Sequence, residues 1–132
     1  MADKNGYVFF YGTLRPAYAP PEIANTVRSL KRVGSGTVKG HLYDLGAYPG
    51  ARLDSKSGRT IRGEVYRLPS DRTILRVLDE YEGYDRRRKG SSLFVRKKWP
   101  VKIGSKSLIC WIYEYNRTPE ELSHKKHNER KN

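Results

Sequence analysis

Residues 6–16 have the sequence GYVFFYGTLRP, an apolar run followed by a tight turn. The first part, Gly6–Phe10, is apolar and aromatic, which predicts a buried strand. Gly12 and Pro16 bracket the loop that follows, because glycine and proline are the strongest local markers of a turn. We therefore expect the fold to begin with a buried strand that ends in the loop Tyr11–Arg15.

The same signals, followed outward along the chain, predict two helices and four more strands. Pro20–Pro21 precedes apolar residues at helical spacing, which predicts a short first helix. The second helix is expected from Arg72 to Glu82, with Ser70–Asp71 as its cap and Gly83 as its stop. The further strands are predicted at Gly34–Asp44, Arg59–Leu68, Leu93–Ile103 and Ser107–Tyr115.

The connections between these strands are short. Leu45–Gly50 is rich in turn residues, Asp54–Gly58 is typical of a hairpin loop, and Gly104–Ser105 predicts a hairpin between the last two strands. Short connections favour antiparallel or mixed pairing. The predicted fold class is α+β, a small five- to six-stranded mixed or antiparallel β-barrel flanked by two helices.

The length of 132 residues suits one domain, which we assign to residues 1–117. Residues 118–132 are polar and basic, and we expect them to form a flexible tail. No apolar run approaches the roughly 20 residues that span a bilayer, so no membrane partner is predicted. The start of the chain lacks a secretory pattern, and the single cysteine, Cys110, suits a reducing compartment. We therefore expect a cytoplasmic protein and a buried, structural Cys110.

The formal charge of +13 is unevenly distributed. Nine lysines and arginines and no acidic residue lie between Arg86 and Tyr113, and four more basic residues lie in the tail. Such a strip can bind nucleic acid or another polyanion, or it can be a solvated basic surface. The aromatic residues nearby alternate as strand residues do, which favours the solvated surface.

Of the three acidic residues near the end of the second predicted helix, one points towards the interior. Each residue turns an α-helix by about 100 degrees, which places Glu82 roughly 50 degrees from the centre of the apolar face. On the same wheel Asp79 lies about 110 degrees away and Glu80 about 150 degrees away. Burial and the negative end of the helix dipole would both raise the pKa of Glu82. A carboxyl group with a pKa near neutrality is suited to general acid–base catalysis, so Glu82 is the candidate catalytic residue.

The loop after the first strand is the candidate binding site. Tyr11, Gly12, Thr13 and Leu14 present successive backbone N–H groups, and such a concavity can bind a carboxylate or an oxyanion. Arg15 can add a charge-assisted hydrogen bond.

Other polar residues do not form a recognisable site. Glu64 is a rival catalytic acid, although a paired structural carboxylate is the commoner role for such a residue. His124 and His127 have metal-like spacing but lack further ligands nearby in the sequence, so no metal is predicted. The sequence contains no phosphate-binding loop and no dinucleotide fingerprint, and we expect no cofactor.

Four segments together resemble the gamma-glutamylcyclotransferase-like superfamily, including its gamma-glutamylamine cyclotransferase (AIG2-like) branch. The segments, in order, are Tyr11–Arg15, Gly40–Pro49, Gly63–Tyr66 and Leu78–Tyr84. The resemblance implies a small barrel whose pocket lies at the end of the first strand. It also implies that the enzyme uses no cofactor and releases a gamma-glutamyl group of a small substrate as 5-oxoproline.

In this resemblance the family's catalytic glutamate corresponds to Glu82, and its substrate loop corresponds to Tyr11, Gly12, Thr13 and Leu14. Phe94 occupies a position where family members often carry tyrosine. Three functions therefore stay open: a cyclotransferase acting on a gamma-glutamyl amine or peptide, a binding module with the same pocket, and a polyanion binder using the basic residues 86–106 and the tail.

Overall fold

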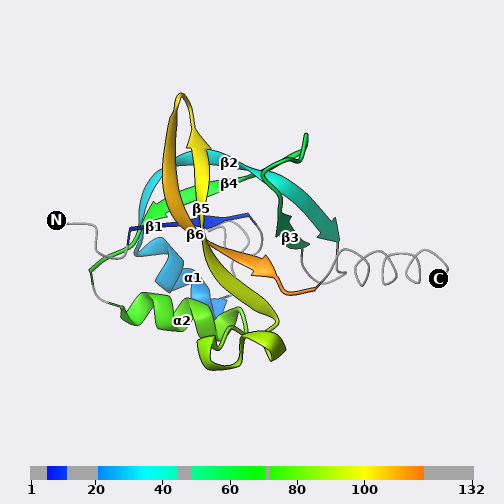
Figure 1. Ribbon diagram of the computed structural model, residues 1–132. Helices are drawn as coiled ribbons and strands as arrows, with labels where there is room; N and C mark the ends of the chain where they lie inside the picture. The colour runs from blue at the N-terminus through cyan, green and yellow to red at the C-terminus, as the bar shows by residue number, and fades with distance from the viewer. Residues whose placement is uncertain (1–5, 12–20, 45–48, 71, 118–132) are drawn as a thin grey trace.

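A computed structural model of the chain describes residues 6–11, 21–44, 49–70 and 72–117. The strands in these residues are β1 (Tyr7–Phe10), β2 (Lys31–Asp44), β3 (Pro49–Leu53), β4 (Thr60–Arg67), β5 (Phe94–Ile103) and β6 (Lys106–Tyr115) (Figure 1). The helices are α1 (Pro21–Arg28) and α2 (Thr73–Tyr81), with a short 3-10 helix, η1, at Arg86–Ser91. The proposed tail, residues 118–132, lies outside the described residues.

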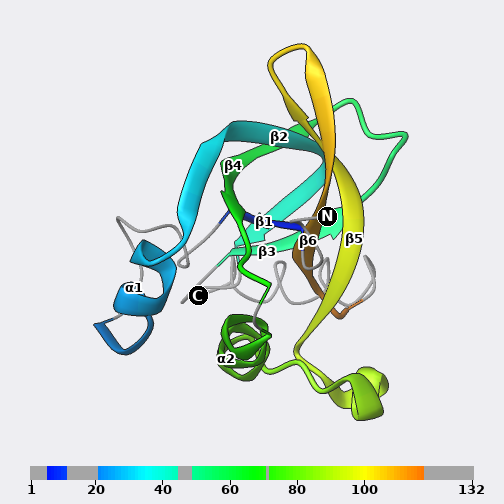
Figure 2. The same ribbon diagram turned by 90° about the vertical axis from the view of Figure 1, so that its left-hand side faces the viewer.

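Five of the strands close into a barrel, and β3 extends it at one edge. The strand order is β3-β2-β4-β1-β6-β5, and a further pairing of Thr37 in β2 with Lys102 in β5 closes the ring. All pairings are antiparallel except that of β1 with β6, which is parallel. Both helices lie on one side of the barrel, and the tip of the β5–β6 hairpin projects from the other (Figures 1 and 2). The predicted fold class is confirmed.

Alternation along the strands divides the core into two layers. Successive strand side chains point to opposite faces, so β1 sends Phe9 to one layer and Val8 and Phe10 to the other. The layer with Phe9 draws residues from all six strands and fills the barrel. The layer with Val8 and Phe10 includes residues of both helices and attaches them to the barrel. Strand β1 thus lies between the barrel interior and the helices.

Gly63 allows β4 to lie close to β1. A Cβ atom at this position would lie 2.3 Å from the carbonyl oxygen of Phe10 and 2.6 Å from the ring of Phe9. No side chain fits at such distances, so the glycine of the Gly63–Tyr66 segment has a packing function at the strand that leads to Tyr11.

Two local predictions differ from the structure. Pro49–Leu53 forms strand β3, which was not among the predicted strands and overlaps the end of the predicted turn at Leu45–Gly50, because its backbone pairs with Gly40–Asp44 of β2. The cap of α2 is Arg72, without a side-chain hydrogen bond, so Ser70 does not cap the helix, and Asp71 lies outside the described residues. Within the described ranges, the helices are too short and too polar to cross a bilayer.

Candidate active site

Glu82 lies at the end of α2, on the side that faces the core. The apolar face predicted for this helix is confirmed: Leu75 and Leu78 are buried, and Ile74 and Tyr81 pack against the same layer. Glu82 is the C-cap residue, and its backbone N–H donates to the carbonyl of Leu78 at 2.9 Å. Gly83 follows with a φ of 69°, a conformation that glycine adopts without strain. The helix end therefore fixes the direction of the Glu82 side chain.

The carboxyl group of Glu82 is largely buried. Burial raises its pKa from 4.5 to about 8. Among the described residues none donates a hydrogen bond to this carboxylate, which agrees with burial being the cause of the shift. A carboxylate removed from water without a partner is costly, and such groups are concentrated at functional sites. The burial of Glu82 agrees with the helical-wheel prediction that its side chain points towards the interior.

Tyr11 connects the end of β1 to two other strands near Glu82. Its hydroxyl donates to the backbone carbonyl of Tyr113 in β6 at 2.5 Å and accepts from the backbone N–H of Ala51 in β3 at 3.2 Å. Burial, followed by the negative charge of Glu82, raises the pKa of Tyr11 above its ordinary value. Tyr11 therefore lies within the electrostatic field of Glu82, as expected for residues of one site. Gly12, Thr13, Leu14 and Arg15 lie outside the described residues.

A second set of polar side chains supports the same helix end. Asp79 accepts hydrogen bonds from Nε and Nη2 of Arg96, at 2.8 and 3.1 Å, and from the hydroxyl of Tyr113 at 2.6 Å. Burial and then the charge of Asp79 raise the pKa of Tyr113, and Glu82 contributes in the same direction. Tyr113 thus lies close enough to both Asp79 and Glu82, which are about one helical turn apart, for the charge of each to act on it.

Sequence reasoning missed Asp79, Arg96 and Tyr113. The helical wheel placed Asp79 beside the apolar face rather than on it. Only the structure shows that side chains of β5 and β6 cover this side of the helix. One signal was present: Trp111, Tyr113 and Tyr115 alternate along one strand, and all three pack in the layer that contains α2. Tyrosine and tryptophan side chains carry hydrogen-bond donors. When they lie on the strand face that packs against a helix with acidic residues, they indicate hydrogen bonds to those carboxylates.

The remaining candidates have structural roles. Glu64 pairs with Arg32 at 3.2 Å and accepts from the hydroxyl of Tyr66 at 2.9 Å, so this rival acid is a paired carboxylate. Cys110 is buried, and burial raises the pKa of its thiol to about 12, which keeps it protonated and unreactive. Phe94 is buried against Tyr115, with ring centroids 5.4 Å apart, and contributes to the layer below α2.

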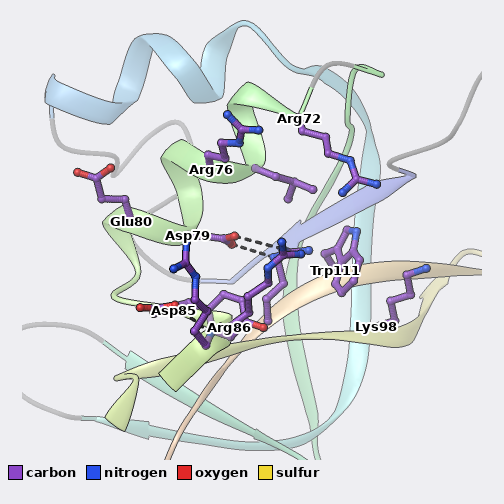
Figure 3. A pocket seen from close by; sticks show the side chains of 12 residues that line it. Arg72, Arg76, Asp79, Glu80, Asp85, Arg86, Lys98 and Trp111 are labelled. Atoms are coloured by element: carbon purple, nitrogen blue, oxygen red, sulfur yellow. Dashed lines mark hydrogen bonds and ion pairs between the residues drawn. The ribbon is translucent and has the colours of Figure 1, made fainter. Parts of the chain in front are cut away.

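A pocket of about 550 Å³ opens beside Asp79 (Figure 3). It extends from α2 to η1 and to the strands that carry Arg96, Lys98 and Trp111. Glu82 is not among its lining residues, so this pocket is distinct from the environment of the candidate catalytic group.

Comparisons with known proteins identify a family for this chain. Residues 8–131 match the family described as gamma-glutamyl cyclotransferase, AIG2-like. No curated protein sequence matches the chain closely enough to count as a relative.

Several solved structures share the fold. An AIG2-like protein from Mus musculus is 22% identical, with a TM-score of 0.64, over 87% of this chain and 80% of the mouse chain. YkqA from Bacillus subtilis is 22% identical, with a TM-score of 0.65, over 86% of this chain. The match spans 36% of YkqA, about a third of its length. A structure described as a gamma-glutamyl cyclotransferase is 17% identical, with a TM-score of 0.59, over 83% of this chain and 66% of the other.

Proposed function

Because the chain belongs to the AIG2-like gamma-glutamyl cyclotransferase family, we propose that it releases 5-oxoproline from a gamma-glutamyl amine or peptide, with Glu82 as the general acid–base. The α-amine of the glutamyl group attacks its own side-chain carbonyl carbon and closes a five-membered ring. The bond from that carbon to the leaving nitrogen then breaks. The reaction uses no water and needs no redox step.

The observation that carries the proposal is the pKa of Glu82, which burial raises to about 8. An ordinary glutamate is far more acidic than an ammonium group, so the raised pKa of Glu82 brings it several units closer to that of the substrate's α-amine and makes proton transfer between them easier. Catalysis by proton transfer is most efficient when the pKa of the catalytic group lies close to the working pH. A glutamate with an ordinary pKa would be a much weaker base towards this amine.

One carboxylate can serve both halves of the reaction. The substrate begins with three protons on its α-ammonium group, and one of them stays on the nitrogen of the lactam product. The other two reach the leaving nitrogen, which departs as an ammonium group. Glu82 carries them one at a time and ends as the carboxylate it was at the start.

Positioning supplies much of the remaining rate. Because attack is intramolecular, a site that folds the glutamyl chain towards ring closure avoids the entropy cost of bringing two reactants together. In the proposal the backbone N–H groups of Gly12, Thr13 and Leu14 bind the α-carboxylate of the substrate, and Arg15 adds charge. Tyr11, anchored to β3 and β6, orients the start of that loop.

An assay of product identity tests the proposal. We expect the protein to convert at least one member of a panel of gamma-glutamyl amines and dipeptides to 5-oxoproline, with one free amine released per ring formed. The rate should rise with pH towards about pH 8, as Glu82 becomes ionised and able to accept a proton. Release of glutamate in place of 5-oxoproline would indicate a hydrolase. An absence of product across the panel would contradict the proposal.

A further inference from the structure

The pocket beside Asp79 is lined by an excess of cationic side chains. Six of its twelve lining residues are arginine or lysine, and three are acidic. The cationic residues come from three parts of the fold: Arg72 and Arg76 from the N-cap and the interior of α2, Arg86 and Arg87 from η1, and Arg96 and Lys98 from β5. Figure 3 shows these elements arranged around one hollow rather than along one line.

Most of these cations lack a counter-charge in the part of the chain that the structure describes. Asp79 is engaged by Arg96 and Tyr113, and the carboxylate of Asp85 accepts the backbone N–H of Arg87 at 2.9 Å. No ion pair involves the guanidinium groups of Arg72, Arg76, Arg86 and Arg87 within the described ranges. These four arginines are therefore available to an external anion.

The two arginines of α2 are spaced so that they repel each other. Arg72 and Arg76 are four residues apart, and like charges at this spacing lie on one side of a helix and destabilise it slightly. An anion that binds between them relieves this repulsion. Their planar guanidinium groups match the geometry of phosphate oxygens better than a lysine ammonium does.

One wall of the pocket is held by several contacts between side chains. The guanidinium carbon of Arg96 lies 4.3 Å from the ring centroid of Trp111 and 5.6 Å from that of Tyr84, and its nitrogens are bonded to Asp79. The ammonium of Lys98 lies 5.0 Å from the ring of Trp111. Asp79 balances the charge of Arg96, so the net positive charge of this wall is that of Lys98, and its contact with Trp111 lowers the cost of ordering it around a bound anion.

We propose that this pocket binds a small molecule that carries two or more phosphate groups. Its volume of about 550 Å³ lies within the range of small-molecule sites, about 300–1,000 Å³. Cations that surround a hollow favour a compact polyphosphate over an extended strand of nucleic acid, which would require a continuous basic surface. Glu82 is not among the residues that line the pocket, so binding can be measured independently of turnover.

Calorimetric titration of the full chain with inorganic tripolyphosphate, in a phosphate-free buffer at low salt, tests the proposal. We expect one site, and at least about tenfold weaker binding in the double variant Arg72→Gln/Arg76→Gln. The double variant Arg86→Gln/Arg87→Gln should bind tripolyphosphate more weakly to a similar degree. Since all four side chains are exposed, both double variants should keep the wild-type circular dichroism spectrum. Arg59→Gln/Lys106→Gln removes the same charge from exposed positions outside the pocket and should bind within about twofold of wild type.

Three results would overturn the proposal. The first is an absence of tripolyphosphate binding to the wild-type chain at low salt. The second is equal weakening by the pocket variants and the Arg59/Lys106 variant, which would show an effect of net charge. The third is a short oligothymidylate that binds more tightly than tripolyphosphate and loses affinity equally in all three variants, which would show an extended nucleic-acid surface.

Discussion

The Glu82→Gln variant is expected to lose turnover by about 10²–10⁴-fold while keeping its fold, because glutamine preserves the shape of the side chain but cannot transfer a proton. The measurement is the initial rate of 5-oxoproline release at pH 8 from the best substrate of the panel. Glu80→Gln is the matched control: it makes the same chemical change two residues earlier, at an exposed position of α2. The control should stay within about twofold of the wild-type rate.

Stability provides an independent readout of the same variant. In the folded chain the pKa of Glu82 is about 8, against 4.5 when it is exposed, so the folded state binds the proton more tightly. The contribution of this group to stability is therefore complete below about pH 4.5 and decreases as the pH rises towards 8. A glutamine at this position cannot ionise, so the variant escapes this loss. Since Glu82 keeps some contact with solvent, we expect the variant to be more stable than wild type by about 2 kcal/mol at pH 8, and by much less at pH 5.

Urea unfolding at the two pH values measures this difference. A variant that loses activity together with stability would indicate that Glu82 supports the fold rather than the reaction. A variant that retains activity within about tenfold of wild type would contradict its assignment as the acid–base.

The second large effect is expected at Asp79, whose replacement by alanine should destabilise the fold by about 3 kcal/mol. The side chains of Asp79 and Arg96 are 20% and 14% exposed, so removal of the carboxylate leaves a guanidinium group largely buried without an acceptor. The buried hydroxyl of Tyr113 loses its acceptor as well. Both losses act on the folded state.

Urea unfolding of Asp79→Ala against Glu80→Ala measures this contribution. Because Glu80 is exposed, its replacement should change the free energy of unfolding by no more than about 0.5 kcal/mol, although it is the neighbour of Asp79 on the same helix. Asp79→Asn keeps one acceptor oxygen and should recover part of the loss. An Asp79→Ala variant within about 1 kcal/mol of wild type would show that the contact with Arg96 and Tyr113 contributes little.

Local patterns were sufficient to predict most elements. The apolar face of α2 and the stop at Gly83 identified the helix and the direction of Glu82, because both depend on residues a few positions apart. Gly104 identified the β5–β6 hairpin for the same reason, and it adopts a φ of 58°. Strand β3 was missed because five residues after a turn carry a weak pattern, and pairing with β2 stabilises them.

Contacts between distant residues were not predictable from such patterns. Asp79 lies 17 residues from Arg96 and 34 from Tyr113 in sequence, and Tyr11 lies 102 residues from the carbonyl it binds. The parallel pairing of β1 with β6, which brings the two ends of the fold together, is needed for the Tyr11 contact. The basic strip was visible in the sequence, but its gathering around a pocket depends on how η1 and β5 meet α2.

The titration of Glu82 itself tests the proposed mechanism most directly. Carbon-13 NMR of protein labelled at the glutamate carboxyl carbon can follow this group through pH, with Glu82→Gln identifying its resonance. We expect a midpoint at about pH 8. A midpoint near 4.5, the value of an exposed glutamate, would contradict the claim that burial prepares Glu82 to exchange protons with the substrate's amine.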